Sequence, residues 1–144
     1  MKFYFLTKDF FDTYSNCNEI EKKENRPYAC SVLIDYEGIT FAIPLRSHIK
    51  HQYAIFSNAE KTKGLDLSKS VVINDLKKFV DQNTKVFIDD EEYKFFLGKE
   101  YFVQQKLKTY IKLYKKALTH QENRKNQILC KNSTLQYFHK ELGI

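Results

Sequence analysis

The fold is decided by the stretch Tyr28-Ala-Cys-Ser-Val-Leu-Ile-Asp-Tyr36, the pair Glu37-Gly38 after it, and the stretch Ile39-Thr-Phe-Ala-Ile-Pro-Leu45 that follows. Apolar residues alternate with others on both sides of Glu37-Gly38, which is typical of two half-buried strands. Gly38 can adopt the positive φ that a tight turn requires. We therefore expect an antiparallel hairpin. Because Pro44 lacks an N–H, its strand should lie at a sheet edge or stop pairing there.

Further strands and helices are expected on both sides of this hairpin. Periodicity and capping residues predict strands at 2–6, 53–56, 64–73 and 85–88, and helices at 8–14, 75–80, 99–118 and 133–141. Asn74 and Ser133 are the expected N-caps of the second and fourth helices. A sheet of five or six strands with helices packed against it gives an α+β fold.

Composition favours one domain over 1–144 and an anionic partner. The chain has 144 residues, 42% of them hydrophobic, and a net charge of +6. This length supports a single core, and a positive field attracts anions such as RNA. Three widely spaced cysteines suggest neither a disulfide framework nor a zinc site, and Lys8 and Asp9 interrupt the apolar start before it could form a signal or membrane segment. We expect a cytoplasmic protein.

The segment Arg46-Ser47-His48-Ile49-Lys50-His51 is the strongest candidate for chemistry. Metal-free RNA cleavage needs a base for the ribose 2′-OH, an acid for the departing 5′-oxygen, and cations around the phosphate. His48 and His51 are candidates for proton transfer, Lys50 and Arg46 for binding phosphate oxygens, and Ser47 for hydrogen bonding to the phosphate or the attacking hydroxyl. From composition alone, a solvated basic loop explains the segment slightly better than a catalytic site does.

The order of three short motifs resembles a known family. The motifs are Lys2-Phe3-Tyr4, Asn25-Arg26-Pro27-Tyr28 and Phe41-Ala42-Ile43-Pro44-Leu45-Arg46-Ser47. They follow one another as in the type III toxin–antitoxin toxins, the ToxN, AbiQ, CptN and TenpN endoribonucleases. The resemblance spans most of the chain. It implies a compact, strongly bent antiparallel sheet surrounded by helices, similar to the barrel-like toxins of the MazF and Kid type.

The resemblance also implies an activity and partners. Such toxins are metal-independent endoribonucleases that leave 2′,3′-cyclic phosphate ends and require no cofactor. A small pseudoknot RNA made of tandem repeats inhibits the toxin, is processed by it, and assembles with it into a closed complex. Cellular RNA is the substrate, and the systems act in phage defence by abortive infection.

Site residues transfer only where the motifs match. Ser47 corresponds to the active-site serine after the Pro-Leu strand end and is the first catalytic candidate, with Lys50, His48 and His51 competing for the roles around it. The family lysine usually lies nearer to the serine than Lys50 does, and ToxN-like members carry Thr where Arg46 stands. The expected RNA-binding residues are Arg26, Tyr28, Arg46, Lys108, Lys112 and Lys115.

Three other interpretations remain open. The acidic run Asp89-Asp90-Glu91-Glu92 is compatible with a metal-bound nuclease site, although a helix dipole explains four acids at a helix start. The basic segment is also compatible with a noncatalytic RNA-binding module, which would bind with steep salt dependence. A MazF-like toxin inhibited by a protein antitoxin is the third alternative.

Overall fold

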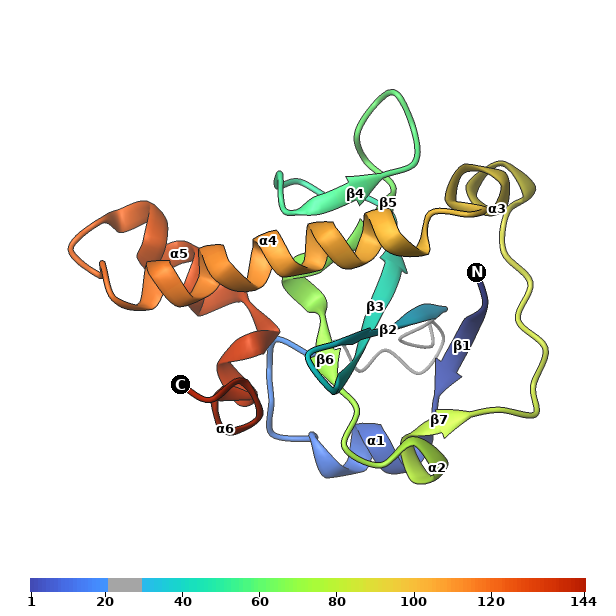
Figure 1. Cartoon of the computed structure of the whole chain (residues 1–144), viewed down its shortest axis with the longest axis horizontal. Coiled ribbons are helices and arrows are strands. Elements are labelled where there is room, and N and C mark those ends of the chain that lie inside the picture. Colours follow the sequence, from blue (N-terminus) through green and yellow to red (C-terminus); the bar gives the residue numbers. More distant parts are fainter. Residues whose placement is uncertain (21–29) are drawn as a thin grey trace.

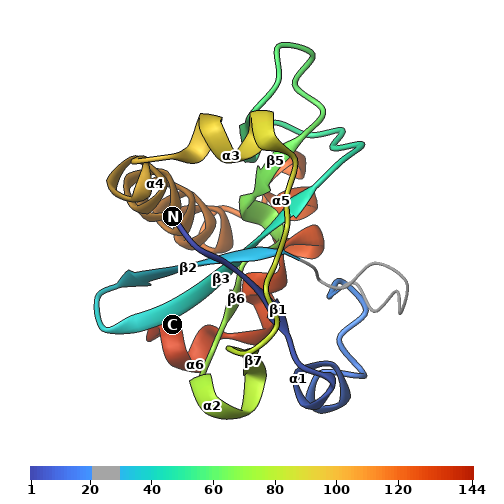
Figure 2. The ribbon, with the colours of Figure 1, turned by 90° about the vertical axis from the view of Figure 1, so that its right-hand side faces the viewer.

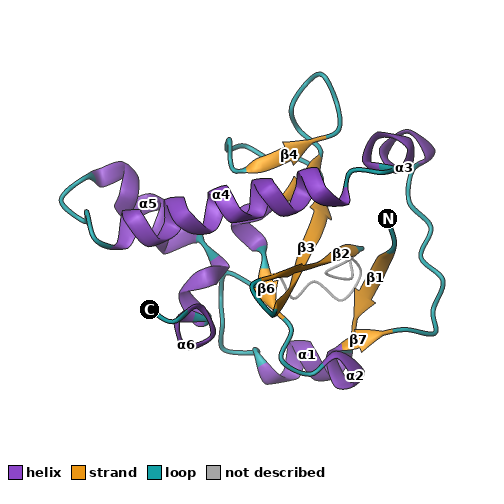
Figure 3. Cartoon of the chain, viewed as in Figure 1, coloured by secondary structure: helices purple, strands orange, loops and turns teal. Residues whose placement is uncertain are grey.

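A computed structural model describes residues 1–20 and 30–144 and has an α+β fold (Figures 1 and 3). The strands are β1 (Phe3–Leu6), β2 (Ser31–Tyr36), β3 (Ile39–Arg46), β4 (Ala54–Phe56), β5 (Gly64–Asp66), β6 (Val71–Val72) and β7 (Val80–Asp81). The α-helices are α1 (Lys8–Thr13), α2 (Leu76–Phe79), α3 (Asp90–Phe96), α4 (Glu100–Leu118), α5 (Arg124–Asn132) and α6 (His139–Leu142). Two 3₁₀-helices are η1 (Leu67–Lys69) and η2 (Thr134–Tyr137).

The expected hairpin is confirmed and forms the centre of the sheet. β2 and β3 pair antiparallel in a register that sets Val32 opposite Ile43 and Tyr36 opposite Ile39. Glu37 and Gly38 have φ values of 51° and 77°. Positive φ at both central residues is typical of a type I′ turn, whose twist matches that of the flanking strands.

Pro44 lies in a central strand and not at a sheet edge, but pairing stops there on one side, which is the other outcome expected from its missing N–H. All pairs are antiparallel in the order β4-β5-β3-β2-β1-β7, and β6 also pairs with β3. The Leu45 N–H donates to the Cys30 carbonyl on the β2 side. Successive strand amides point in opposite directions, so the Pro44 nitrogen faces the other side. On that side of β3, pairing with β6 ends at Ala42, and pairing with β5 begins at Leu45. Pairing is interrupted on that side, as the missing N–H requires.

The expected barrel is not formed, which corrects the fold implied by the MazF and Kid comparison. β4 and β7 remain the two ends of an open sheet within the described part of the chain. The expected strand at 85–88 is also absent. Pairing of β7 with β1 ends at Asp81, whose carboxylate accepts hydrogen bonds from the Asn83 and Thr84 amides. Those amides are used within this turn, and the chain continues as the long connection to α3 (Figure 1, right).

Helix α4 is the expected amphipathic helix and lies across the sheet (Figures 1 and 2). The Gln104 side chain donates to the Asp35 carbonyl of β2 at 2.6 Å. The residues buried along one stripe are Val103, Leu107, Tyr110, Ile111, Tyr114 and Ala117. Among the described residues, no helix is both long and apolar enough to span a membrane.

Other boundaries differ from the expected ones for local reasons. The strand expected at 64–73 is divided by η1, because the Asp66 side chain caps that turn at the Ser68 amide. α2 is capped by Asp75 instead of Asn74. Ser133 is an N-cap as expected, but the final helix is split into η2 and α6. α3 begins in the acidic run, which agrees with the helix-dipole interpretation of that run.

Candidate functional site

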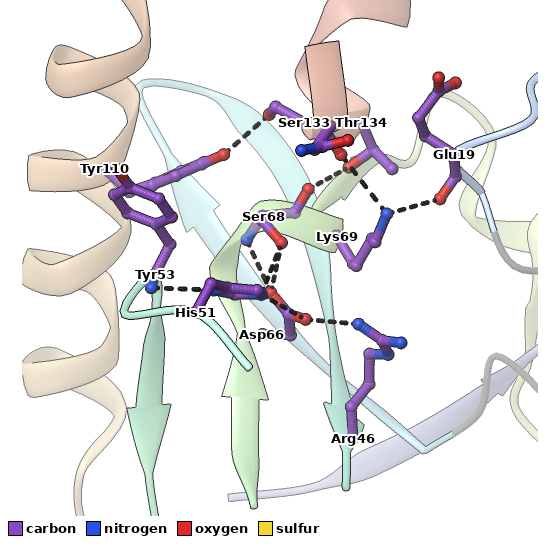
Figure 4. Close-up of polar contacts among 11 residues, drawn as sticks. Glu19, Arg46, His51, Tyr53, Asp66, Ser68, Lys69, Tyr110, Ser133 and Thr134 are labelled. Atoms are coloured by element: carbon purple, nitrogen blue, oxygen red, sulfur yellow. Dashed lines mark hydrogen bonds and ion pairs between the residues drawn. The ribbon is translucent and has the colours of Figure 1, made fainter. Parts of the chain in front are cut away.

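The candidate site is centred on Asp66, the last residue of β5 (Figure 4). β5 lies between β4 and β3, which places Asp66 opposite Ala54 and Gly64 opposite Arg46. Gly64 is required at this point, because a Cβ there would lie 2.0 Å from the Ile55 carbonyl oxygen. The close approach of β4 and β5 thus brings a carboxylate beside the end of β3. The Asp66 side chain is completely buried.

Four hydrogen-bond contacts surround the Asp66 carboxylate. Oδ2 accepts from Arg46 Nη1 at 2.6 Å and lies 3.2 Å from His51 Nε2. Oδ1 accepts from the Ser68 hydroxyl at 2.6 Å and from the Ser68 amide at 3.0 Å. Burial on its own raises the pKa of Asp66, but the contacts from His51, Ser68 and Arg46 outweigh burial and lower the pKa. Asp66 is therefore a buried, ionised carboxylate.

The contacts of His51 define its tautomer. The Tyr53 amide donates to His51 Nδ1 at 3.0 Å, so Nδ1 carries a lone pair. The proton of the neutral ring is then on Nε2, which lies 3.2 Å from both Asp66 Oδ2 and Ser68 Oγ. The ring also stacks on Tyr53, with centroids 5.8 Å apart. Both nitrogens of His51 are engaged within the protein.

Between Arg46 and His51, the chain forms a loop that projects alternate side chains to solvent. Ile49 is buried, and its amide donates to the Thr62 carbonyl in the β4–β5 loop at 2.9 Å. Its neighbours His48 and Lys50 are both exposed, whereas Ser47 is half-buried. His48 has a φ of 59°. This left-handed conformation is costly for a residue with a Cβ and often marks a functional position.

A second layer of polar contacts supports the residues around Asp66. The Thr134 hydroxyl donates to the carbonyls of Ser68 and Ser70. Lys69 Nζ donates to the Glu19 carbonyl at 3.1 Å and to the Asn132 carbonyl at 3.4 Å. These bonds tie η1 to the C-terminal segment and to the chain after α1, as Figure 4 shows. These contacts hold η1, and with it Ser68, in place beside the Asp66 carboxylate.

The predicted site residues fall into three groups: those near the end of β3, those outside the described residues, and the lysines of α4. Arg46, Ser47, His48, Lys50 and His51 lie together at the end of β3 and in the following loop. Arg26 and Tyr28 lie outside the described residues.

The predicted lysines of α4 share one flank of the helix. Lys108, Lys112 and Lys115 follow Gln104 by four, eight and eleven residues and therefore share its flank, on which Gln104 contacts β2. Contact with the loop side is made instead through Tyr110, whose ring centroid is 6.1 Å from that of Tyr53.

The sequence did not identify Asp66 or Ser68 as site residues. Their only signal was a carboxylate within the segment 64–73, which the sequence predicts to be a strand, because a charge that is buried there requires partners. Among residues 1–20 and 30–144, no group of three or more His, Cys, Asp or Glu side chains is arranged to hold a metal ion.

The chain was compared with models of protein families, with characterised proteins and with solved structures, and none of the three comparisons gives a match.

Proposed function

We propose that this protein is a metal-independent endoribonuclease of the toxin type, which cleaves RNA by 2′-OH attack and leaves 2′,3′-cyclic phosphate ends. One observation carries the proposal. A single buried oxygen, Oδ2 of Asp66, contacts both Arg46 and His51, the two ends of a loop that exposes His48 and Lys50 and includes Ser47. Such anchoring holds several cationic and titratable groups in a fixed arrangement, as catalysis of phosphoryl transfer requires.

The geometry favours different roles for the two histidines. His51 uses Nδ1 to accept from Tyr53 and directs Nε2 at Asp66, so it can exchange a proton with substrate only by breaking an internal bond. We assign it a positioning role. His48 is exposed, and imidazole is suited to proton transfer near neutral pH. His48 and Lys50 are therefore our candidates for the base and the acid.

The remaining groups serve the phosphate. The Arg46 guanidinium is oriented by Asp66 and still has a quarter of its side chain exposed. Together with Lys50, it would neutralise charge on the pentavalent phosphate, where fixed cations are most effective. Ser47, between Arg46 and His48, would hydrogen-bond a phosphate oxygen or the attacking hydroxyl.

The proposed partners are RNA molecules. A net charge of +6 favours a polyanion, and the motif Phe41 to Ser47, which resembles the type III toxins, lies along β3 and enters the site. We accordingly propose a cytoplasmic toxin that cleaves cellular RNA in phage defence. A small pseudoknot RNA antitoxin, which the toxin itself processes, would inhibit it within a closed toxin–RNA complex.

Cleavage of RNA in excess EDTA tests the proposal. The purified protein should cleave, Ser47→Ala should abolish cleavage but retain RNA binding, and the exposed control Ser15→Ala should cleave normally. Cleavage that EDTA stops would indicate a metal-dependent nuclease. Binding with steep salt dependence but no cleavage would indicate a noncatalytic RNA-binding module.

The DNA beside the gene distinguishes the two toxin classes. Short tandem repeats followed by a terminator are expected for an RNA antitoxin, whereas a small acidic open reading frame would indicate a protein-inhibited toxin.

A further inference from the structure

A cavity lies at the edge of β1 that the connection from β7 to α3 passes. The connection from β7 to α3 runs beside β1 and leaves a cavity of about 510 Å³ between them. This volume lies within the range of about 300–1,000 Å³ typical of small-ligand sites. Residues from β1, from the connection and from α3 line the cavity, among them Phe3, Asn83, Lys85, Phe87 and Tyr93.

The cavity exists because β7 leaves β1 early. The Asp81 carboxylate accepts from the Asn83 amide at 2.9 Å, the Thr84 amide at 3.0 Å and the Thr84 hydroxyl at 2.6 Å. These bonds, chiefly those from Thr84, lower the pKa of Asp81 and keep the turn in place at neutral pH. Pairing with β1 is thereby stopped, and the part of β1 that precedes Phe5 is left facing the cavity.

The walls combine aromatic faces with cationic and amide groups. Phe87 is 81% exposed and Tyr93 is 44% exposed, so both rings are accessible for stacking. Lys85 Nζ lies 5.3 Å from the centre of the Phe87 ring, which places an ammonium group beside the stacking surface. The Asn83 side chain offers both donors and an acceptor to a base edge. Aromatic faces next to lysines are characteristic of sites for unpaired nucleotides.

We propose that this cavity binds one unpaired nucleotide of RNA, with its base stacked on Phe87 and its phosphate near Lys85. The inference rests on the proposed RNA-cleaving function, for which it supplies a substrate-binding subsite. Asp90, which also lines the cavity, can accept N–H groups of a base. Its carboxylate disfavours phosphate at its own position, so the phosphate is assigned to the Lys85 side.

An extended peptide fits the site less well. Strand addition needs several unpaired backbone groups along an edge. The Thr7 amide donates to the carbonyl of Phe79, the residue just before β7, so by alternation the Phe5 and Phe3 amides point to the same side of β1. Because Phe5 already pairs with Asp81, Phe3 is the one residue of β1 that can offer its backbone to a peptide.

Helix α3 connects this cavity to the candidate active site. Tyr93 lines the cavity, whereas the neighbouring Glu92 interacts with Ser57 and Lys63 in the β4–β5 loop. The same loop binds the Ile49 amide through the Thr62 carbonyl. RNA held at Phe87 would therefore be directed across α3 toward the loop of Ser47.

Binding of a fluorescein-labelled pentaribonucleotide to the Ser47→Ala protein, followed by anisotropy, tests the proposal. Phe87→Ala should weaken binding about tenfold or more, because one stacked base is lost. Lys85→Ala should reduce the slope of log K against log[salt] by about 0.7. Tyr101→Ala and Lys77→Ala remove an exposed ring and an exposed lysine outside the cavity and should change neither quantity. Phe87 is so exposed that its removal should not affect folding.

The outcomes separate this inference from the proposed function. RNA binding that is weakened by Phe87→Ala supports the subsite even if the wild-type protein cleaves nothing. Cleavage by the wild-type protein together with unchanged binding by Phe87→Ala overturns the subsite and leaves the function intact. Hydrogen exchange provides a second readout. Bound RNA should slow exchange of the Phe3 amide. Slower exchange with an extended peptide but not with RNA would also overturn the proposal.

Discussion

Replacing Asp66 by Asn tests the centre of the candidate site with almost no change in volume. All the groups around the carboxylate are donors: the Arg46 guanidinium, the His51 Nε2–H, and the amide and hydroxyl of Ser68. An Asn side chain has one acceptor oxygen, so its NH₂ group must face either Arg46 and His51 or Ser68. In either orientation, donors that are buried or partly buried lose their acceptor.

The size of the effect follows from burial. Removing one partner of a buried ion pair costs about 3–5 kcal/mol, but a quarter of the Arg46 side chain is exposed, so water compensates in part. We expect the free energy of unfolding to fall by about 2–4 kcal/mol. For a chain of this length, the melting temperature should fall by about 5–15 °C. Asp35→Asn, which alters an exposed carboxylate bonded to Thr40, should cost less than about 0.5 kcal/mol.

The assay is thermal unfolding followed by circular dichroism at two pH values. The pKa of folded Asp66 lies below its ordinary value of 3.8, so its ionisation stabilises the fold at neutral pH, and this contribution is lost as the pH falls from about 4 through the lowered pKa. The difference between wild type and Asp66→Asn should thus be large at pH 7 and shrink near pH 3. An equal difference at both pH values, or none at pH 7, would refute the reasoning.

Three further predictions concern single positions. Gly64→Ala should lower the free energy of unfolding by about 3 kcal/mol or more in urea titration, because its Cβ meets the Ile55 backbone; a loss below about 1 kcal/mol would contradict this. His48→Gly should raise the free energy of unfolding by about 1 kcal/mol by relieving the positive φ, yet slow RNA cleavage about 100-fold; unchanged cleavage would exclude His48 from proton transfer. Tyr110→Phe removes a buried 2.8 Å hydrogen bond to Ser133 and should cost about 1–2 kcal/mol in the same titration, whereas no loss would mean that the bond contributes nothing.

Much of the fold could be predicted from periodicity, where burial follows a regular spacing. The hairpin of β2 and β3 alternates in sequence, and α4 carries its buried residues at three- and four-residue intervals. α5 could not be predicted in this way, because Leu129 is the one residue of the helix that is buried. The missing strand at 85–88 and the open sheet depend on the Asp81 side chain, which competes with β1 for backbone amides.

The loop of the candidate site could be predicted from its dense polar side chains, but the residue that organises it could not. Asp66 is fifteen residues from His51 and twenty from Arg46 and reaches both through the pairing of β5 with β3. Pairing between strands that are not adjacent in sequence is not encoded in local spacing. The difference between His48 and His51 likewise depends on a contact with the Tyr53 amide and not on residue type.

The chemistry of the RNA ends tests the central claim most directly. The purified protein should be incubated with RNA in excess EDTA, and the 3′ ends of the products identified by mass spectrometry. The proposed mechanism predicts 2′,3′-cyclic phosphate ends with the wild-type protein and no such products with Ser47→Ala. Products with 3′-hydroxyl ends, or undiminished cleavage by Ser47→Ala, would contradict it.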